Sequence, residues 1–142
     1  CTVCVSDAEG FGLATLESLA CGTPIITTMT GGPQEQVTDG TNWFGVGLEP
    51  ASKAIIGSQD VPFIYEDRVS GEDVKDAFLK IYNMTTKERR EMGEMGMQHV
   101  ADNYSFSSYG DSWVKLMLDV HEKHGSWETR KNYNSWHLME VA

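Results

Sequence analysis

Residues 1–28 follow an order of elements that strongly limits the fold: a strand, a glycine-containing turn, a helix and a second strand. Residues 1–5 and 25–28 are short apolar or β-branched runs, residues 13–21 carry apolar side chains at helical spacing, and residues 22–24 end that helix. Two strands joined through a helix lie parallel, are connected by a right-handed crossover, and need helices packed on their sheet. The sequence therefore predicts an α/β fold with a small parallel sheet flanked by helices.

The stretch between the second strand and the next helix is less regular. Residues 30–33 predict a second tight turn, and Pro33 is suited to the first turn of a short helix. Residues 41–63 are rich in Gly, Pro and Ser. We expect a loop there with one or two short strands, for example near 44–48 and 62–65.

The second half of the chain predicts three helices. Ser70-Gly71-Glu72-Asp73, a cap residue with an acidic first turn, is typical of a helix start. Thr86 is expected to cap the second helix, and Ser107 or Ser108 the third. Each helix carries a set of apolar residues, in chain order Val74, Ala77, Phe78, Ile81 and Tyr82; Met92, Met95 and Val100; Trp113, Leu116, Met117 and Val120. The first set is expected to share one face of its helix.

The length of 142 residues suffices for one hydrophobic core but not for two ordinary domains. Residues 1–142 are therefore interpreted as a single partial domain, with a polar and aromatic tail at residues 125–142. The sequence opens directly on a strand and without an initiator Met, which suggests a fragment. Because an uncovered strand edge invites association, we expect a homodimer or a larger assembly.

The charge balance argues against nucleic acid as a partner. Eleven Lys and Arg stand against 21 Asp and Glu, the net charge is -10, and the first basic side chain is Lys53. A nucleic-acid backbone would be repelled by this field. The sequence also has no run of about 18 apolar residues and no signal-peptide pattern. We expect a cytoplasmic protein without a transmembrane segment.

Cysteine and histidine do not indicate a redox or metal centre. Cys1 and Cys4 have a CxxC spacing, but their neighbours are typical of a strand rather than of a helix start, which favours buried strand cysteines. His121 and His124 lie three residues apart on a predicted helix. A third ligand is missing, so a solvated helix end is the favoured interpretation and no metal site is predicted.

The segment Gly10-Phe11-Gly12-Leu13 joins the first strand to the first helix. A glycine turn at this place leaves backbone N–H groups unpaired at the positive end of the helix dipole, which favours an anion such as a phosphate. No Lys or Arg is near in sequence, so the dipole would supply the local positive potential, about 0.3 to 2 kcal/mol for one anionic group. The alternative is a plain strand-to-helix turn with no ligand.

Two carboxylates flank this turn. Glu9 precedes it, and Glu17 follows eight positions later, one turn into the predicted helix. Both can face the space beyond the strand ends, where open α/β sheets bind ligands. An ionised carboxylate accepts hydrogen bonds from paired hydroxyls of a sugar or ribose. An anion site between two such acceptors is complementary to a sugar nucleotide. Glu17 taken alone is equally consistent with a solvated helix face.

Four motifs in a fixed order resemble those of a known family. They are Glu9-Gly10-Phe11-Gly12-Leu13, Glu17 at an E-x7-E spacing, Ala20-Cys21-Gly22-Thr23-Pro24, and Gly31-Gly32-Pro33-Gln34-Glu35-Gln36-Val37. Over residues 3–40 the chain resembles the carboxyl-terminal, nucleotide-sugar-binding half of a retaining GT-B glycosyltransferase of the family-4 type.

This resemblance implies a partial Rossmann-like domain and a role for each site residue. Glu9 would hold the hydroxyls of the donor sugar and is the candidate catalytic residue, and Glu17 would bind the ribose. The amides of Gly12 and Leu13, in the turn with Gly10 and Phe11, would receive the diphosphate. Gly31 and Gly32 would line the donor-sugar side. The family implies a nucleotide diphosphate sugar as substrate, retaining transfer of a hexosyl group, no obligatory metal and no further cofactor.

The chain also departs from the family pattern. Such enzymes supply an Arg and a Lys upstream of this region and an amino-terminal domain that binds the acceptor, and neither stands in this sequence. The stretch 50–63 resembles an insertion. We therefore expect a donor-side portion that binds a sugar nucleotide weakly and does not complete the transfer alone.

Two further groups of side chains receive an interpretation. Three methionines, Met92, Met95 and Met97, are expected to serve in core and helix-face packing. Tail side chains could stack on a sugar, but docking on the amino-terminal domain is favoured for them: Trp127, Tyr133, Trp136 and His137. Two alternatives to the glycosyltransferase hypothesis stay open, a non-catalytic nucleotide-sugar-binding module and an α/β assembly module.

Overall fold

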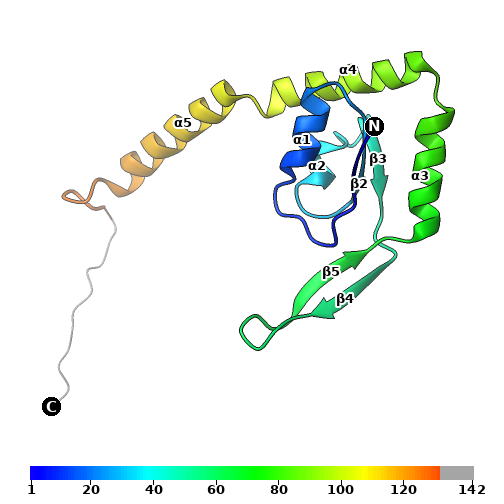
Figure 1. Ribbon diagram of the computed structural model, residues 1–142. Helices are drawn as coiled ribbons and strands as arrows, with labels where there is room; N and C mark the ends of the chain where they lie inside the picture. The colour runs from blue at the N-terminus through cyan, green and yellow to red at the C-terminus, as the bar shows by residue number, and fades with distance from the viewer. Residues whose placement is uncertain (132–142) are drawn as a thin grey trace. The chain divides into compact units, whose positions relative to one another are not determined.

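The computed structural model describes residues 1–131. The chain divides into two compact units, Cys1–Asn103 and Tyr104–Ala142. The first unit contains strands β1 to β5 and helices α1 to α4, and the second contains helix α5 (Phe106–His124) (Figure 1).

The first unit is built on a parallel sheet. Its strands β1 (Thr2–Cys4), β2 (Ile25–Thr28) and β3 (Gly45–Leu48) lie in the order β1-β2-β3, and β2 is parallel to both neighbours. Helix α1 (Leu13–Ala20) makes the crossover from β1 to β2. The predicted α/β fold and the strand expected near 44–48 are therefore confirmed.

Helices cover both faces of this sheet, as a parallel sheet requires. The side chains of Ile25 and Ile26 point to opposite faces and enter different clusters. Ile26 packs with residues of β3, of α3 (Gly71–Asn83) and of α4 (Thr86–Asn103). Ile25 packs with Leu19 of α1, with Phe44, and with Val37 at the end of α2 (Pro33–Gln36). The sheet is thus the middle layer of the unit.

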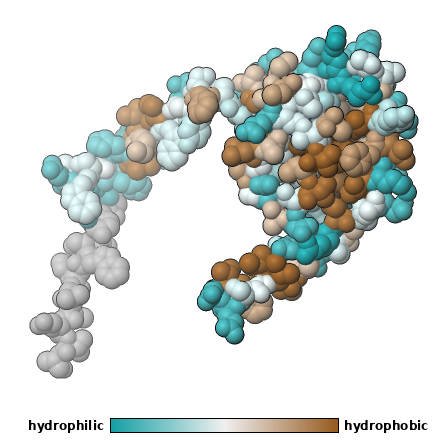
Figure 2. Space-filling view, in the orientation of Figure 1, coloured by the Kyte–Doolittle hydropathy of each residue, from teal (hydrophilic) through white to brown (hydrophobic). Residues whose placement is uncertain are grey.

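Residues 41–63 differ from the expected loop. After β3 the chain forms an antiparallel hairpin of β4 (Ser52–Ile56) and β5 (Ile64–Arg68). The sequence analysis missed β4 and placed the last strand slightly early, at 62–65. Several apolar and aromatic side chains of this hairpin are exposed, among them Ile55, Phe63 and Tyr65. Figure 2 shows hydrophobic, brown surface on part of the hairpin. Because neither face of the hairpin is fully buried, its sequence lacks the alternation that marks a half-buried strand.

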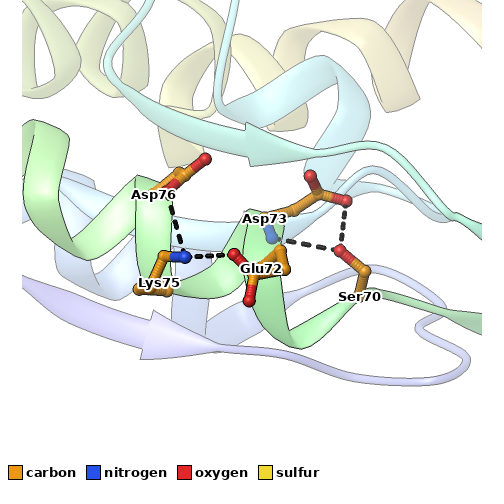
Figure 3. Close-up of polar contacts among 5 residues, drawn as sticks. All are labelled: Ser70, Glu72, Asp73, Lys75 and Asp76. Carbon is orange, nitrogen blue, oxygen red and sulfur yellow. Dashed lines mark hydrogen bonds and ion pairs between the residues drawn. The ribbon is translucent and has the colours of Figure 1, made fainter.

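Helix α3 begins where the sequence predicts. The Ser70 hydroxyl accepts a hydrogen bond from the Asp73 amide at 3.0 Å, and Lys75 lies between the carboxylates of Glu72 and Asp76 (Figure 3). The ion pairs of Lys75 are exposed on the surface of the helix.

The buried face of α3 is narrower than its apolar face. Ala77 and Ile81 are buried, but Phe78 is 45% exposed and Tyr82 81% exposed. Successive residues of a helix are rotated by about 100°, so the positions following Ala77 and Ile81 turn away from the sheet. The apolar side of α3 is therefore only partly buried, with Phe78 and Tyr82 at its exposed margin.

The helix caps fall slightly earlier than expected. Thr85, and not Thr86, is the N-cap of α4. Its hydroxyl accepts a hydrogen bond from the Glu88 amide at 3.2 Å, while the Glu88 carboxylate accepts one from the Thr85 amide at 2.6 Å. This reciprocal pair is a capping box. In α5 the cap is Ser105, whose hydroxyl accepts from the Ser108 amide, so the expectation of Ser107 or Ser108 is wrong.

Several other predictions have mixed outcomes. Cys1 and Cys21 are exposed and Cys4 is half-buried, so the interpretation as buried strand cysteines is wrong for Cys1. Met92 is buried, whereas Met95 and Met97 are nearly half exposed. Trp127 is 84% exposed, with the Arg130 guanidinium 3.7 Å from its ring centroid. Tyr133, Trp136 and His137 lie outside the described residues.

Over residues 1–131, no helix combines the length and the apolar character needed to cross a membrane. The same part of the chain holds no group of three or more His, Cys, Asp or Glu side chains placed to bind a metal ion.

Candidate functional site

The predicted site residues of the first loop and of the glycine turn, 9–12 and 31–32, come together at the carboxyl ends of β1 and β2, whereas Glu17 lies on α1. The loop of residues 5–12 follows β1, and the turn of residues 29–32 follows β2 (Figure 1). In a parallel sheet these ends lie at the same edge, which is where open α/β sheets bind ligands. The two segments are in direct contact, since the Gly32 amide donates to the Gly10 carbonyl at 2.7 Å.

The glycines of the second turn are required by close backbone packing. A Cβ atom at Gly31 would lie 1.9 Å from the Glu9 carbonyl oxygen, and one at Gly32 would lie 2.1 Å from that of Phe11. Gly31 also has a φ of 56°, a backbone conformation that residues other than glycine rarely adopt. The two glycines therefore let the turn lie directly against the loop that carries Glu9.

Gly12 and Gln36 complete this packing. Gly12 is the N-cap of α1, with a φ of 84°, and a Cβ there would lie 2.8 Å from the Pro33 ring. The Gln36 side chain is 1% exposed and donates from Nε2 to the Phe11 carbonyl, while its Oε1 has no partner among the described residues. The sequence analysis gave Gln36 no role of its own. The signal that could have pointed to Gln36 was its place in the motif that begins Gly31-Gly32-Pro33.

Three carbonyl groups of the loop are held by hydrogen bonds from other segments of the chain. Those of Asp7, Gly10 and Phe11 accept hydrogen bonds from Asp67, Gly32 and Gln36. In a planar trans peptide the C=O and N–H bonds point in opposite directions. The Gly12 amide, which follows the Phe11 carbonyl, is thereby directed away from Gln36.

The start of α1 keeps free hydrogen-bond donors. Within residues 1–131, the amides of Gly12, Leu13 and Ala14 have no acceptor, and no side chain caps the helix. These N–H groups lie at the positive end of the helix dipole. The arrangement has the donors that the predicted anion site needs, and anion binding itself stays a prediction.

The two predicted carboxylates occupy different settings. Glu9 is half-buried, and its side chain accepts from the Gly10 amide at 3.1 Å and from the Ser6 hydroxyl at 3.5 Å. Glu17 is exposed on α1, away from the face that buries Thr15, Ser18 and Leu19. It lies four positions after Leu13, and therefore on the same side of the helix as the free Leu13 amide.

The structure adds a basic residue that the sequence analysis missed. Arg68, from β5, forms an ion pair with Asp7 and a second one with Glu66 at 2.6 Å. The hydrogen bond to Asp7 and the attraction of both carboxylates raise the pKa of Arg68 above its usual value, against a smaller opposing effect of desolvation. The expectation that the helix dipole alone supplies the local positive potential is therefore wrong, because Arg68 lies beside the loop although it is distant in sequence. No local motif signals a contact over 61 positions.

A second group of polar residues lies next to α4. A cavity of about 340 Å³ is lined by Asp39, Phe44, His99 and neighbouring residues. The His99 ring stacks on Phe44, with centroids 4.5 Å apart. Hydrogen bonds, above all from the Asn42 backbone, lower the pKa of Asp39 to about 2. These contacts hold the turn before β3 together.

Comparison with known proteins shows which sequences this chain resembles. Residues 1–56 match the sequence model of the family described as Glycosyl transferases group 1. The chain is 26% identical over 108 residues to Sucrose synthase 1 of Zea mays, covering 76% of this chain and 11% of that protein. It is 34% identical over 101 residues to D-inositol 3-phosphate glycosyltransferase of Acidothermus cellulolyticus, covering 63% of this chain and 22% of that protein.

A solved structure has the same fold. Sucrose-phosphate synthase from Thermosynechococcus elongatus aligns with a TM-score of 0.63 and 22% identity, over 86% of this chain and 26% of that one. The chain spans 11% to 22% of the length of the two relatives named above. Residues 1–56 are therefore similar in sequence to the group 1 glycosyl transferases, and the chain shares its fold with part of the sucrose-phosphate synthase.

Proposed function

We propose that this chain binds the donor of a retaining glycosyltransferase, a nucleotide diphosphate sugar whose hexosyl group is transferred to an acceptor. The observation that carries the proposal is the row of unpaired amides at Gly12, Leu13 and Ala14, at the start of α1 and inside the segment that matches the family. A diphosphate has the charge and the acceptor oxygens that such a helix start favours.

The flanking carboxylates are given the roles that the family resemblance implies. Glu17, on the same side of α1 as Leu13, accepts from the ribose hydroxyls. Glu9, beside the Gly31-Gly32 turn, accepts from hydroxyls of the donor sugar and is the proposed catalytic residue. An ionised carboxylate only accepts hydrogen bonds, so it suits vicinal hydroxyls and repels phosphate. The proposal needs neither a metal nor another cofactor.

Electrostatics limit the affinity of this site. The chain has a net charge of -10, and Arg68 is already paired with two carboxylates. The helix dipole contributes only about 0.3 to 2 kcal/mol for one anionic group. We therefore propose that the chain binds donor weakly and that transfer also needs an acceptor-binding domain, as the resemblance implies.

Titration of the chain with nucleotides tests the proposal. UDP, GDP and ADP, each with a sugar conjugate, are titrated by calorimetry or by NMR, and one of them should give a saturable signal. Glu17→Gln should weaken that binding, because an amide also presents an N–H donor to the ribose. Glu72→Gln, an exposed glutamate on α3, is the matched control and should leave binding unchanged.

The two alternatives predict other outcomes. An α/β assembly module gives no saturable signal with any nucleotide and no effect of Glu17→Gln. A non-catalytic binding module binds donor as proposed but shows no transfer when the acceptor-binding domain is supplied. Loss of binding in Glu72→Gln as well would show that the effect of Glu17→Gln is not specific to the site, because removing a remote negative charge from a chain of net charge -10 should favour an anionic ligand if it has any effect.

A further inference from the structure

The β4–β5 hairpin reaches the loop that follows β1. The hairpin starts just after β3, and its base is closed by a hydrogen bond from the Ala51 amide to the Arg68 carbonyl at 2.8 Å. Strands β3 and β1 lie on opposite sides of β2, so their ends are about 10 Å apart. The hairpin crosses this interval, and the Asp67 amide donates to the Asp7 carbonyl at 2.6 Å.

Side chains strengthen this contact. Arg68 is bonded through Nη1 to Asp7 and through Nη2 to Glu66. One guanidinium charge thus meets two carboxylate charges, which leaves the cluster with a net charge of about -1 at neutral pH. A diphosphate gains little from a cation that is already paired in this way. Direct neutralisation of the ligand is therefore not the role of Arg68.

The contact holds the loop at its beginning. Toward its end, the loop is anchored by Gly32 at the Gly10 carbonyl and by Gln36 at the Phe11 carbonyl. At the β1 end the loop is attached through Asp7. Its carbonyl accepts a hydrogen bond from the Asp67 amide, and its carboxylate accepts one from Arg68. Two-ended attachment fixes the direction of the peptide planes between these points, and so the direction of the amides that follow.

We infer that Arg68 is a positioning residue for donor binding: through Asp7 it holds the loop of residues 7–12 so that the Gly12 and Leu13 amides stay directed at the diphosphate. The inference rests on the proposed function and deepens it. The inference also assigns a role to the β4–β5 hairpin, because residues of β5 hold the β1 end of the loop.

The ion pair is exposed, and this separates a positioning role from a structural one. The side chains of Arg68 and Asp7 are 40% and 52% exposed. Exposed ion pairs contribute little to global stability. Removing Arg68 should therefore leave the fold intact and raise only the local opening of the loop.

The experiment compares Arg68→Met with a matched control, Lys75→Met. Lys75 is also a surface cation between two carboxylates, Glu72 and Asp76, but it lies on α3 (Figure 3). Hydrogen–deuterium exchange is followed in peptides that cover residues 6–14, without ligand. Affinity is measured by calorimetry with UDP-glucose, GDP-mannose and ADP-glucose. Urea unfolding of each variant shows whether the fold is intact.

The expected result is faster loop exchange in Arg68→Met, with a donor affinity lower by about three- to tenfold. Arg68→Lys should recover part of the affinity, because it keeps the charge but cannot bridge both carboxylates in a fork. Lys75→Met should match the unaltered chain in both measurements.

Three other results are informative. If the unaltered chain binds one of the donors and Arg68→Met changes neither exchange nor affinity, the inference is overturned while the proposed function stands. If the unaltered chain binds none of the three donors, the proposed function fails for them, and the positioning role fails with it. Equal loss of affinity in Arg68→Met and Lys75→Met would also overturn the inference, since it would reflect general charge.

Discussion

Substitution of Gly31 by alanine tests the packing of the two turns at the sheet edge. The added Cβ would lie 1.9 Å from the Glu9 carbonyl oxygen and 2.7 Å from that of Gly10, so the turn and the loop must move apart. The backbone adds a second penalty, because φ at Gly31 is 56° and a left-handed conformation costs a non-glycine residue about 1–2 kcal/mol. Overpacking adds about 1–3 kcal/mol. We expect Gly31→Ala to lower the free energy of unfolding by about 2–5 kcal/mol.

Gly10→Ala is the matched control in the facing loop. No atom lies within 4 Å of a Cβ at Gly10, and its φ is outside the left-handed region. Its effect should be within about 1 kcal/mol of zero, because the backbone tolerates alanine and the unfolded chain loses some freedom. The assay is urea unfolding of both variants, followed by circular dichroism. Equal stability of Gly31→Ala and Gly10→Ala would refute the close backbone contact on which the description of the site depends.

Four further predictions follow from individual contacts. Gly93→Ala should destabilise the chain by about 1–3 kcal/mol in urea unfolding, because the added Cβ would lie 2.0 Å from the Gly22 carbonyl oxygen. Unchanged stability would contradict the packing of α4 against the residues that follow α1. Thr85→Ala should cost about 1 kcal/mol by loss of the α4 capping box, measured in the same way, with no change if the cap is absent. In the folded chain the pKa of Asp39 is lowered from an ordinary 3.8 to about 2 by hydrogen bonds, the strongest of them from the Asn42 backbone. The ionised Asp39 therefore stabilises the fold above pH 3.8, and this stabilisation is lost as the pH falls toward 2. In acid titrations, Asp39→Asn should lose less stability over that interval than the unaltered chain. Strand β1 pairs with β2 alone among the described residues, so we expect dimers or larger assemblies in light scattering, and a monomer at high concentration would contradict this.

Local sequence signals were sufficient for the sheet and for the shape of the loop. The β-branched run at 25–28, the turn before it and the helical spacing of 13–21 each report on their own neighbourhood. Together they predict the parallel pair β1 and β2 with α1 between them, as the structure has it. The left-handed φ of Gly12 and the tight turn at Gly31 were likewise accessible, since glycine is favoured where the backbone takes such conformations.

Contacts between distant segments could not be predicted in this way. The hairpin lacks a buried face, so nothing in its hydrophobic pattern distinguishes β4 from a loop. Arg68 reaches Asp7 only because the hairpin crosses the ends of the strands. Phe78 and Tyr82 satisfy the helical period as well as Ile81 does, and only the position of the sheet decides which of them is buried.

The packing requirements divide the motif into two groups of residues. Gly12, Gly31 and Gly32 are each required by a close contact or by a left-handed backbone, and Gln36 fills a buried position. An assembly module with a tightly packed turn and no ligand would need all four. Their presence in the sequence therefore does not discriminate between a binding site and a plain turn.

The remaining motif residues are the discriminating ones. Gly10 has open space where its Cβ would be, and Phe11 and Leu13 expose 55% and 65% of their surfaces. Glu17 stands on the exposed side of α1, where packing would accept almost any polar residue. Under the proposed function, donor binding gives a reason for a glutamate at the E-x7-E spacing, whereas the fold gives none. Glu17→Gln should accordingly leave the urea midpoint unchanged while it weakens nucleotide binding, and a variant that lost stability without losing affinity would assign Glu17 to the architecture instead.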